Sequence, residues 1–260
     1  FISSLMKKFF YRLLILIFFG IFGFVIYLST VGIKTNKFNK QISSEVKKIN
    51  NQLELDLNEI GIFLDLSKLQ LILKTVGPNL KNKDKTIKFE SISSNIDIKK
   101  IINGQFSPNE LKISTRSLEI KKLISFIRLI ENNPQLYVLE KFIKKGYLIA
   151  DIVLKFNEQG KLKEDYIIKG LIKDGEIKKI QKYNFSKINF FFNFKKDMLE
   201  FNEIKLSLNN KDILFPKLNV KNDQNKFLIS GKNINNNIFL SENEIYQFLN
   251  KDLFFPSVLS

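Results

Sequence analysis

Alternation of apolar and polar residues dominates the second half of the chain. Phe190, Phe192 and Phe194 share one parity, and Asn189 and Asn193 share the other. Successive side chains of a β-strand point to opposite faces, so this period of two predicts strands with one apolar face and one polar face. Polar turn sequences separate such segments at 157–160, 174–175, 195–197, 209–210 and 222–225. The pattern predicts an antiparallel meander over residues 147–232.

Parity also assigns the side chains to the two faces of this meander. The candidates for the apolar lining are Leu148, Ala150, Ile152, Leu154, Phe156, Ile168, Ile172, Ile188, Phe190, Phe192, Phe194, Ile204, Leu206 and Leu208. The opposite positions carry mainly charged and amide side chains, so we expect that face to be wet. An apolar face needs a cover, and after Gly146 the sequence offers one short helix candidate, at 241–250. Either a second sheet from residues 53–115 closes a sandwich or barrel, or the face stays open to an apolar ligand.

An uncharged apolar run near the N-terminus predicts a membrane span. No charged residue occurs from Leu13 to Leu28, and with residues 9–12 the segment reaches the ~20 residues that cross a ~30 Å hydrocarbon core. The predicted anchor residues are Leu13, Leu14, Ile15, Leu16, Ile17, Phe18, Phe19, Ile21, Phe22, Phe24, Val25, Ile26 and Leu28. A cleaved signal peptide is the alternative, since Ser29 and Thr30 are small enough for a processing site.

The charges beside this run favour one orientation. Lys7, Lys8 and Arg12 precede the span and favour a cytoplasmic N-terminus, which leaves the bulk of the chain across the membrane.

Helical periods appear in two places outside the anchor. Phe38, Ile42, Val46 and Ile49 form one stripe of an amphipathic helix, and residues 118–146 predict two short helices, the second beginning at a proline. The predicted organisation is a cytoplasmic tip and anchor at 1–30, a linker helix at 31–52, a first β segment at 53–117, a helical insertion at 118–146, the β meander at 147–232 and the start of a further segment at 233–260.

Composition argues against several kinds of chemistry. The chain contains no cysteine, histidine or tryptophan, which removes disulfides and thiolate or imidazole metal ligands. We expect no enzyme activity, no cofactor and no metal site. The net charge is +16, yet Arg12, Arg116 and Arg128 are the only arginines, so nucleic acid is not an expected partner. The lysines indicate either a solvated face or affinity for an anionic membrane surface.

The order of these segments resembles the AsmA-like family of Gram-negative envelopes, the group that includes TamB and YhdP. The stretches that carry the resemblance are the apolar helix, "FNKQISSEVKKIN", "LELDL", "SNIDIKKIINGQF", "STRSLEIKKLISFIR" and "ADIVLKFNEQGKLKEDYIIKGLIKDGEI". It covers most of residues 7–232 and lies in architecture rather than in a catalytic signature. It implies a single-pass inner-membrane protein whose periplasmic part is an elongated, twisted antiparallel β-sheet groove with a short helical insertion.

The resemblance also implies a function. Similar proteins are thought to carry phospholipids from the inner to the outer membrane, with acyl chains on an apolar groove and an outer-membrane or periplasmic protein as partner. AsmA-like members that bridge the envelope are much longer, so we expect an N-terminal fragment of a longer protein, or a chain that hands lipid to a partner. The alternatives are an assembly factor for outer-membrane proteins and a short lipopolysaccharide-transfer bridge.

Overall fold

The computed structural model describes residues 2–103, 107–131, 133–178, 183–223, 226–232 and 234. The strands are β1 (Ile33–Thr35), β2 (Leu53–Asp56), β3 (Ile60–Asp65), β4 (Gln70–Val76), β5 (Asn79–Asn82), β6 (Lys85–Asp97), β7 (Glu110–Thr115), β8 (Leu118–Glu119), β9 (Ile143–Lys155), β10 (Ile167–Ile177), β11 (Phe185–Lys195), β12 (Met198–Leu208), β13 (Lys211–Asp223) and β14 (Lys226–Lys232). Apart from Ile234, the predicted further segment at 233–260 and its short helix at 241–250 lie outside the described residues.

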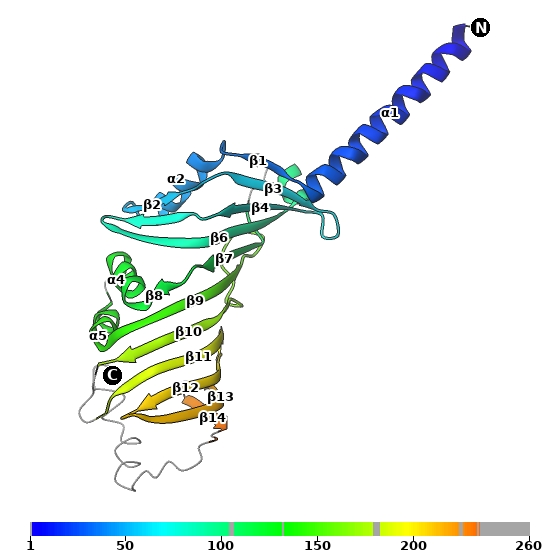
Figure 1. Ribbon diagram of the computed structural model, residues 1–260. Helices are drawn as coiled ribbons and strands as arrows, with labels where there is room; N and C mark the ends of the chain where they lie inside the picture. The colour runs from blue at the N-terminus through cyan, green and yellow to red at the C-terminus, as the bar shows by residue number, and fades with distance from the viewer. Residues whose placement is uncertain are drawn as a thin grey trace.

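One large antiparallel sheet contains all of these strands, stacked along the length of the molecule (Figure 1). Its main path runs β1-β3-β4-β6-β7-β9-β10-β11-β12-β13-β14, while β2 pairs with β5, β5 with β6, and β8 with β9. Within the described residues β1 and β14 form the two ends and do not pair, so the sheet is not closed. The predicted fold class, mainly β with an N-terminal apolar helix and a short helical insertion, is confirmed.

The sandwich alternative is wrong. Strands from residues 53–115 do not form a second sheet over the meander, because β7 pairs edge to edge with β9 through Ile113 and Ile152. Residues 53–115 and the meander therefore extend the same sheet in one direction, and the apolar face continues from one into the other.

Helix α1 (Ile2–Thr30) projects from the first strands of the sheet (Figure 1). Its segment Phe9–Thr30 is uncharged except for Arg12 and spans about 33 Å at 1.5 Å per residue, which is long and apolar enough to cross a membrane. The predicted anchor residues all lie in this helix, and most are exposed. A signal sequence would have the same length and composition, so α1 fits either a membrane anchor or a signal sequence.

A hydrogen bond and ring contacts join α1 to the sheet. The Ser29 hydroxyl donates a hydrogen bond to the Leu64 carbonyl oxygen in β3, at 2.8 Å. Gly32 ends the helix with φ of 74°, a conformation that favours glycine. The Phe63 ring occupies the space beside Gly32 and Gly61, where an added Cβ would lie 2.6 and 2.7 Å from the ring. These contacts attach the end of α1 to β3.

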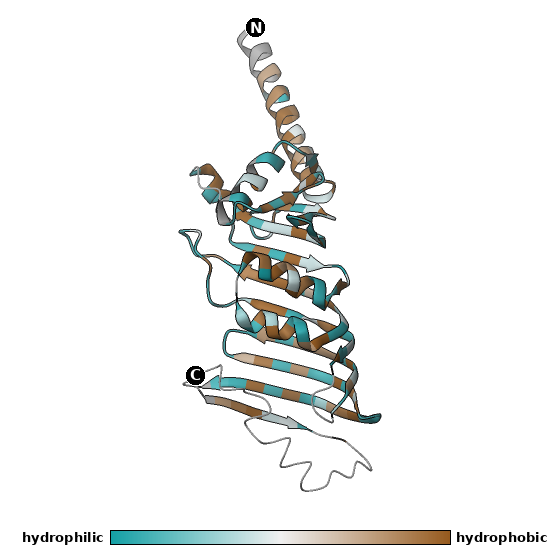
Figure 2. Cartoon of the chain, turned by 90° about the vertical axis from the view of Figure 1, so that its left-hand side faces the viewer, coloured by the Kyte–Doolittle hydropathy of each residue, from teal (hydrophilic) through white to brown (hydrophobic). Residues whose placement is uncertain are grey.

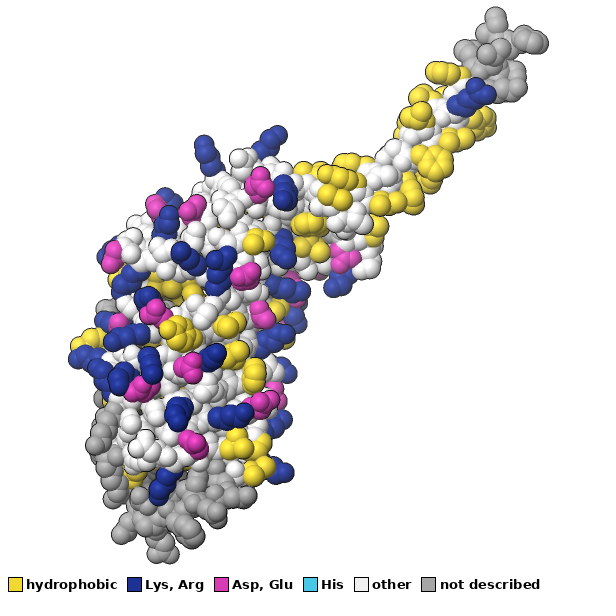
Figure 3. All heavy atoms as spheres, viewed as in Figure 1, with side chains coloured by type: hydrophobic (Ala, Val, Ile, Leu, Met, Phe, Trp, Pro, Cys, Tyr) yellow, Lys and Arg dark blue, Asp and Glu magenta, His cyan; other side chains and the backbone are white. Residues whose placement is uncertain are grey.

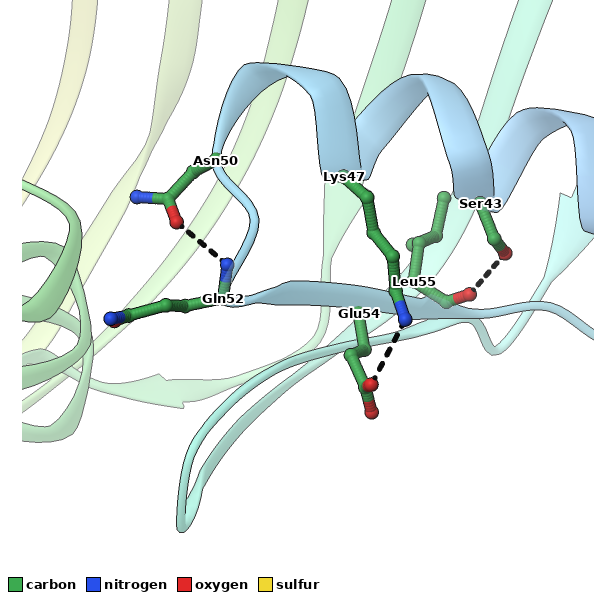
Figure 4. A network of polar contacts seen from close by, with 6 residues as sticks. All are labelled: Ser43, Lys47, Asn50, Gln52, Glu54 and Leu55. Carbon is green, nitrogen blue, oxygen red and sulfur yellow. Dashed lines mark hydrogen bonds and ion pairs between the residues drawn. The ribbon is translucent and has the colours of Figure 1, made fainter.

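Helix α2 (Asn39–Ile49) fills the predicted linker and packs against β2 (Figure 4). Ser43 donates from its hydroxyl to the Leu55 carbonyl oxygen at 2.6 Å, and Lys47 pairs with Glu54 at 3.1 Å. The predicted linker of residues 31–52 thus contains β1 as well as a helix. It is attached to the sheet through both of these elements.

The helical insertion consists of α4 (Ile120–Ile130) and α5 (Pro134–Phe142), and α3 (Ile98–Ile102) lies earlier, after β6. In Figure 2 the two helices of the insertion lie in front of the strands. The Asn133 side chain caps α5 by accepting from the Gln135 backbone N–H at 2.8 Å, and Pro134 takes the first helical position, as predicted. The insertion ends sooner than expected, because β9 already begins at Ile143.

The hydrophobic core lies near the anchor end. Leu53, Ile87, Leu118 and Phe126 form a buried cluster, which joins β2, β6, β8 and α4. This cluster covers the first strands from one side, and α4 and α5 extend the cover onto β9, the first meander strand.

Three consecutive meander strands carry a residue with positive φ in the strand interior. Asp174 in β10, Lys187 in β11 and Glu203 in β12 have φ of 52°, 51° and 51°, and the strand register shifts beside each. Such β-bulges bend a strand and increase its twist. The turn predicted at 174–175 is therefore wrong: Asp174 and Gly175 form a bulge inside β10.

Candidate functional site

One unbroken row of paired residues runs along the apolar face from β3 to β14. We call this row the apolar ladder; its members, each paired with the next across neighbouring strands, are Ile60, Thr75, Ile92, Ile113, Ile152, Ile168, Phe194, Leu199, Val220 and Ile229. Paired residues lie on the same face of a sheet, and neighbouring strands are ~4.8 Å apart, so the ladder is about 43 Å long. Thr75 is its one member without an aliphatic or aromatic side chain.

Two shorter rows lie beside the ladder, one after the other on the same side of it. One contains Ala150, Gly170, Phe192, Phe201, Leu218 and Gly231, and the other Leu118, Leu148, Ile172 and Phe190. Rows on one face are two residues apart, or ~7 Å, so the apolar surface is several rows wide.

Phenylalanine rings join these rows in the centre of the meander. Phe190 and Phe194 contact the Phe201 ring edge to face, with centroids 5.7 and 5.5 Å apart, and the Phe192 and Phe194 centroids are 4.8 Å apart. Such geometry stabilises aromatic pairs beyond the burial of their area. Phe192 is 6% exposed, so its ring is buried within this cluster.

Exposure increases along the ladder away from the anchor. Ile60 and Thr75 are 2% and 5% exposed, whereas Ile229 in β14 is 70% exposed. The members between them, such as Ile152 and Ile168, are half-buried. Partly exposed aliphatic and aromatic side chains in a continuous row form a surface that can hold an extended apolar ligand.

The lining candidates fall on this face with one exception. Leu148, Ala150, Ile152 and Leu154 follow one parity in β9, and the candidates in β10, β11 and β12 lie in register with them. Ala150, Ile204 and Leu208 are buried rather than open, at 4%, 8% and 4%. Phe156 lies beyond the end of β9, in an isolated bridge with Leu162.

Parity alone missed Phe201. The residue has the opposite parity from Ile204, yet both side chains lie on the apolar face, because the bulge at Glu203 reverses the alternation between them. No local signal marks that bulge, since Glu203 is an ordinary polar residue of a strand sequence.

The opposite face, which we call the outer face, is less polar than expected. It carries hydrogen-bonded pairs such as Ser114 with Asp151 at 2.7 Å, and lysine side chains spread across the visible side of the molecule in Figure 3. However, Ile149, Leu171 and Phe191 form a short apolar row on it, in which Ile149 is 42% and Phe191 48% exposed. The expectation of a wet outer face is correct for most positions and wrong for these three.

Ionisable groups at the rim of the sheet are paired structurally. Lys144 and Lys145 both reach Glu176, and their hydrogen bonds lower the pKa of that carboxyl from its ordinary value. Within the described ranges no group of three or more acidic side chains is placed to hold a metal ion. The expectation of a protein without enzyme activity stays a prediction.

Comparison of the chain with protein-family models, with curated proteins and with solved structures gave no match. The fold and the site define the class: an open antiparallel β-sheet protein with an N-terminal apolar helix and a continuous apolar row along one face. Membership of the AsmA-like family is therefore a proposal.

Proposed function

We propose that this chain is an AsmA-like envelope protein, anchored in the bacterial inner membrane by α1, with a cytoplasmic N-terminus and a periplasmic sheet. Its apolar face holds phospholipid acyl chains in a groove and contributes to lipid transport from the inner to the outer membrane. The carrier has no cofactor and no enzyme activity, and it passes its cargo to an outer-membrane or periplasmic protein.

The observation that carries this proposal is the continuity of the apolar ladder. One leaflet of a ~30 Å hydrocarbon core is ~15 Å deep, so a ladder of about 43 Å exceeds the length of one acyl chain almost threefold. An acyl chain can therefore move along the row without leaving apolar contact. A simple sheet core would need no such row reaching from the anchor end to an exposed edge.

The energetics suit transfer rather than tight binding. Burial of apolar area stabilises by ~25 cal/mol per Å². This free energy scales with the buried area and does not depend on how the buried groups are oriented. From Ile92 to Val220 every member of the ladder is aliphatic or aromatic and half-buried, so the free energy of a bound chain changes little from one of these strands to the next. Head groups remain in water beside the lysine-rich strand edges.

The junction of α1 with the sheet supports an uncleaved anchor. Processing near Ser29 or Thr30 would remove the hydrogen bond from Ser29 to Leu64 and expose the ring of Phe63. A helix that ends in such contacts is part of the folded structure, which is unusual for a cleaved leader.

The test compares two isoleucines of β9 that lie on opposite faces. Ile152 belongs to the apolar ladder, and Ile149 lies on the outer face at 42% exposure. Ile152→Asp places a charged carboxylate in the path of an acyl chain. Moving a charged group from water to an apolar site costs free energy. We expect the purified Ile152→Asp protein to lose most of its co-extracted phospholipid, measured by native mass spectrometry and lipid extraction.

The matched control is Ile149→Asp, which introduces the same charge in the same strand. It should retain the lipid of the wild type, and both variants should keep the circular dichroism of a β-sheet protein. Equal lipid content in all three proteins would refute the proposal.

A second function, assembly of outer-membrane proteins, is favoured by the exposed edge strand β14. Phe227, Leu228 and Ile229 are 65%, 54% and 70% exposed there, and an edge strand can accept a client strand. A photoreactive residue at Leu228 that crosslinks to outer-membrane β-strand proteins, and not to lipid, would favour this function. The lipopolysaccharide bridge would lack the helical insertion that α4 and α5 form, so we do not propose it.

A further inference from the structure

Exposed apolar side chains gather at the anchor end of the sheet, outside the apolar ladder. Leu66 and Leu69 lie in the turn between β3 and β4 and are 50% and 57% exposed, and Ile102 at the end of α3 is 78% exposed. Leu69 also has φ of 51°, an uncommon conformation for a residue with a branched side chain. Burial in the fold does not explain these three residues, because each faces solvent.

The turn that presents the two leucines is well defined. The Asp65 carboxylate accepts hydrogen bonds from the backbone N–H groups of Ser67 and Lys68, at 3.0 and 3.2 Å, and from the Ser67 hydroxyl. The hydrogen bond from Ser67 lowers the pKa of the Asp65 carboxyl. Asp65 therefore fixes the turn, and the leucines on either side of Ser67 and Lys68 are held outward.

This turn lies next to the end of α1. Ser29 contacts Leu64, and Leu66 is two residues further along the chain, ~7 Å from Leu64 at strand spacing. The Ile98 backbone N–H donates to the Leu69 carbonyl oxygen at 3.1 Å, which places the start of α3 against the same turn. In Figure 1 the short helix in the colour of residues 98–102 lies at the level of the lower end of α1, and in Figure 3 hydrophobic side chains continue from α1 onto the body.

Lysines accompany the apolar groups. Lys68 lies in the turn, Lys99 is exposed on α3, and Lys34 follows α1 in β1. Lysines near a membrane surface are attracted to anionic lipid head groups, and apolar residues beside them can enter the interface. Apolar groups with flanking cations beside the end of a membrane-spanning helix match the chemistry of one leaflet surface.

We propose that the β3–β4 turn and α3 dock on the surface of the same bilayer that α1 crosses. Leu66, Leu69 and Ile102 enter the interfacial layer, and Lys68 and Lys99 lie among anionic head groups. The docking goes beyond lipid transport but rests on the proposed anchor. It sets the sheet at a fixed angle to the membrane, with the first strands of the ladder at the lipid surface.

The test uses the absence of native cysteine in the chain. Single variants Leu66→Cys and Ile102→Cys are labelled with an environment-sensitive fluorophore in the full chain, which is placed in nanodiscs of zwitterionic and anionic phospholipid. The nanodiscs carry a quencher on the upper acyl carbons. Phe22→Cys in α1 is the anchor control, and Leu162→Cys, 56% exposed beyond β9, is the distant control. Thermal melting verifies that each labelled protein is folded.

We expect the labels at Leu66, Ile102 and Phe22 to lose most of their fluorescence, and the label at Leu162 to keep it. Quenching at Phe22 without quenching at Leu66 and Ile102 overturns the docking and leaves the anchor intact. A label at Phe22 that is not quenched overturns the anchor, and the docking with it. Either result is distinct from failure of lipid transport, which the Ile152→Asp comparison measures.

Discussion

Gly170 shows at the scale of one residue how the apolar face is packed. It lies between Ala150 and Phe192 in the row beside the ladder. An added Cβ would lie 2.1 Å from the Ile149 carbonyl oxygen and 2.9 Å from Cζ of Phe192. The absent side chain lets the Phe192 ring lie on the strand, which closes the centre of the phenylalanine cluster.

The substitution Gly170→Ala should therefore destabilise the sheet. The clash is with backbone, which cannot move as a side-chain tip does, so we expect the free energy of unfolding to fall by about 1–3 kcal/mol. Denaturant unfolding of the detergent-solubilised protein measures this. Gly23→Ala in α1, where an added Cβ meets nothing within 4 Å, should leave the unfolding of the sheet unchanged. Equal stability of the Gly170→Ala protein would mean that β9 and β10 are further apart there.

At the scale of elements, α4 and α5 are held together by charge. The Arg128 guanidinium pairs with the Glu140 carboxylate and lies over the Tyr137 ring, 4.7 Å from its centroid. The hydrogen bond from Arg128 lowers the pKa of Glu140 from its ordinary value of 4.5. Because the folded pKa is below the unfolded one, the stabilisation is complete above the unfolded value and is lost as pH falls through the folded pKa.

The melting temperature should accordingly decrease as the medium is acidified below about pH 4.5, and part of that decrease should vanish in Glu140→Gln. Thermal melts of both proteins between about pH 3 and pH 7 measure the effect. Glu131→Gln removes a carboxylate just after α4 without touching the pair with Arg128, so its profile should follow that of the wild type. A Glu140→Gln profile parallel to the wild type would show that the pair contributes nothing.

At the scale of the whole molecule, packing is uneven from end to end. The buried cluster of Leu53, Ile87, Leu118 and Phe126 lies near the anchor, while the far strand β14 exposes Phe227 and Ile229. Regions with fewer buried apolar contacts open more readily. Stability should therefore decline along the sheet in the same direction in which the ladder becomes exposed.

Hydrogen exchange followed by mass spectrometry should reveal this gradient. We expect amides of β4 and β6 to exchange slowest and those of β14 fastest, with the meander strands between them. Protection of β14 equal to that of β6 would contradict the gradient and would mean that the edge strand is covered.

Much of the local structure follows from the sequence, because it depends on neighbours along the chain. Side-chain parity placed Ile152, Ile168 and Phe194 on one face, and the Asn133 and Pro134 pair marked the start of α5. The apolar run marked α1 as a helix able to cross a membrane.

Tertiary structure decided the features that depend on distant partners. The register that aligns Ile60 with Ile229 through ten strands is set by pairing between strands. The parity of residues within one strand does not determine this register. The bulge at Glu203, which brings Phe201 onto the apolar face, is likewise set by the strands on either side. The sequence by itself determined which residues can share a face. Only the folded sheet decided that they form one continuous row, because that order depends on contacts between residues far apart in the chain.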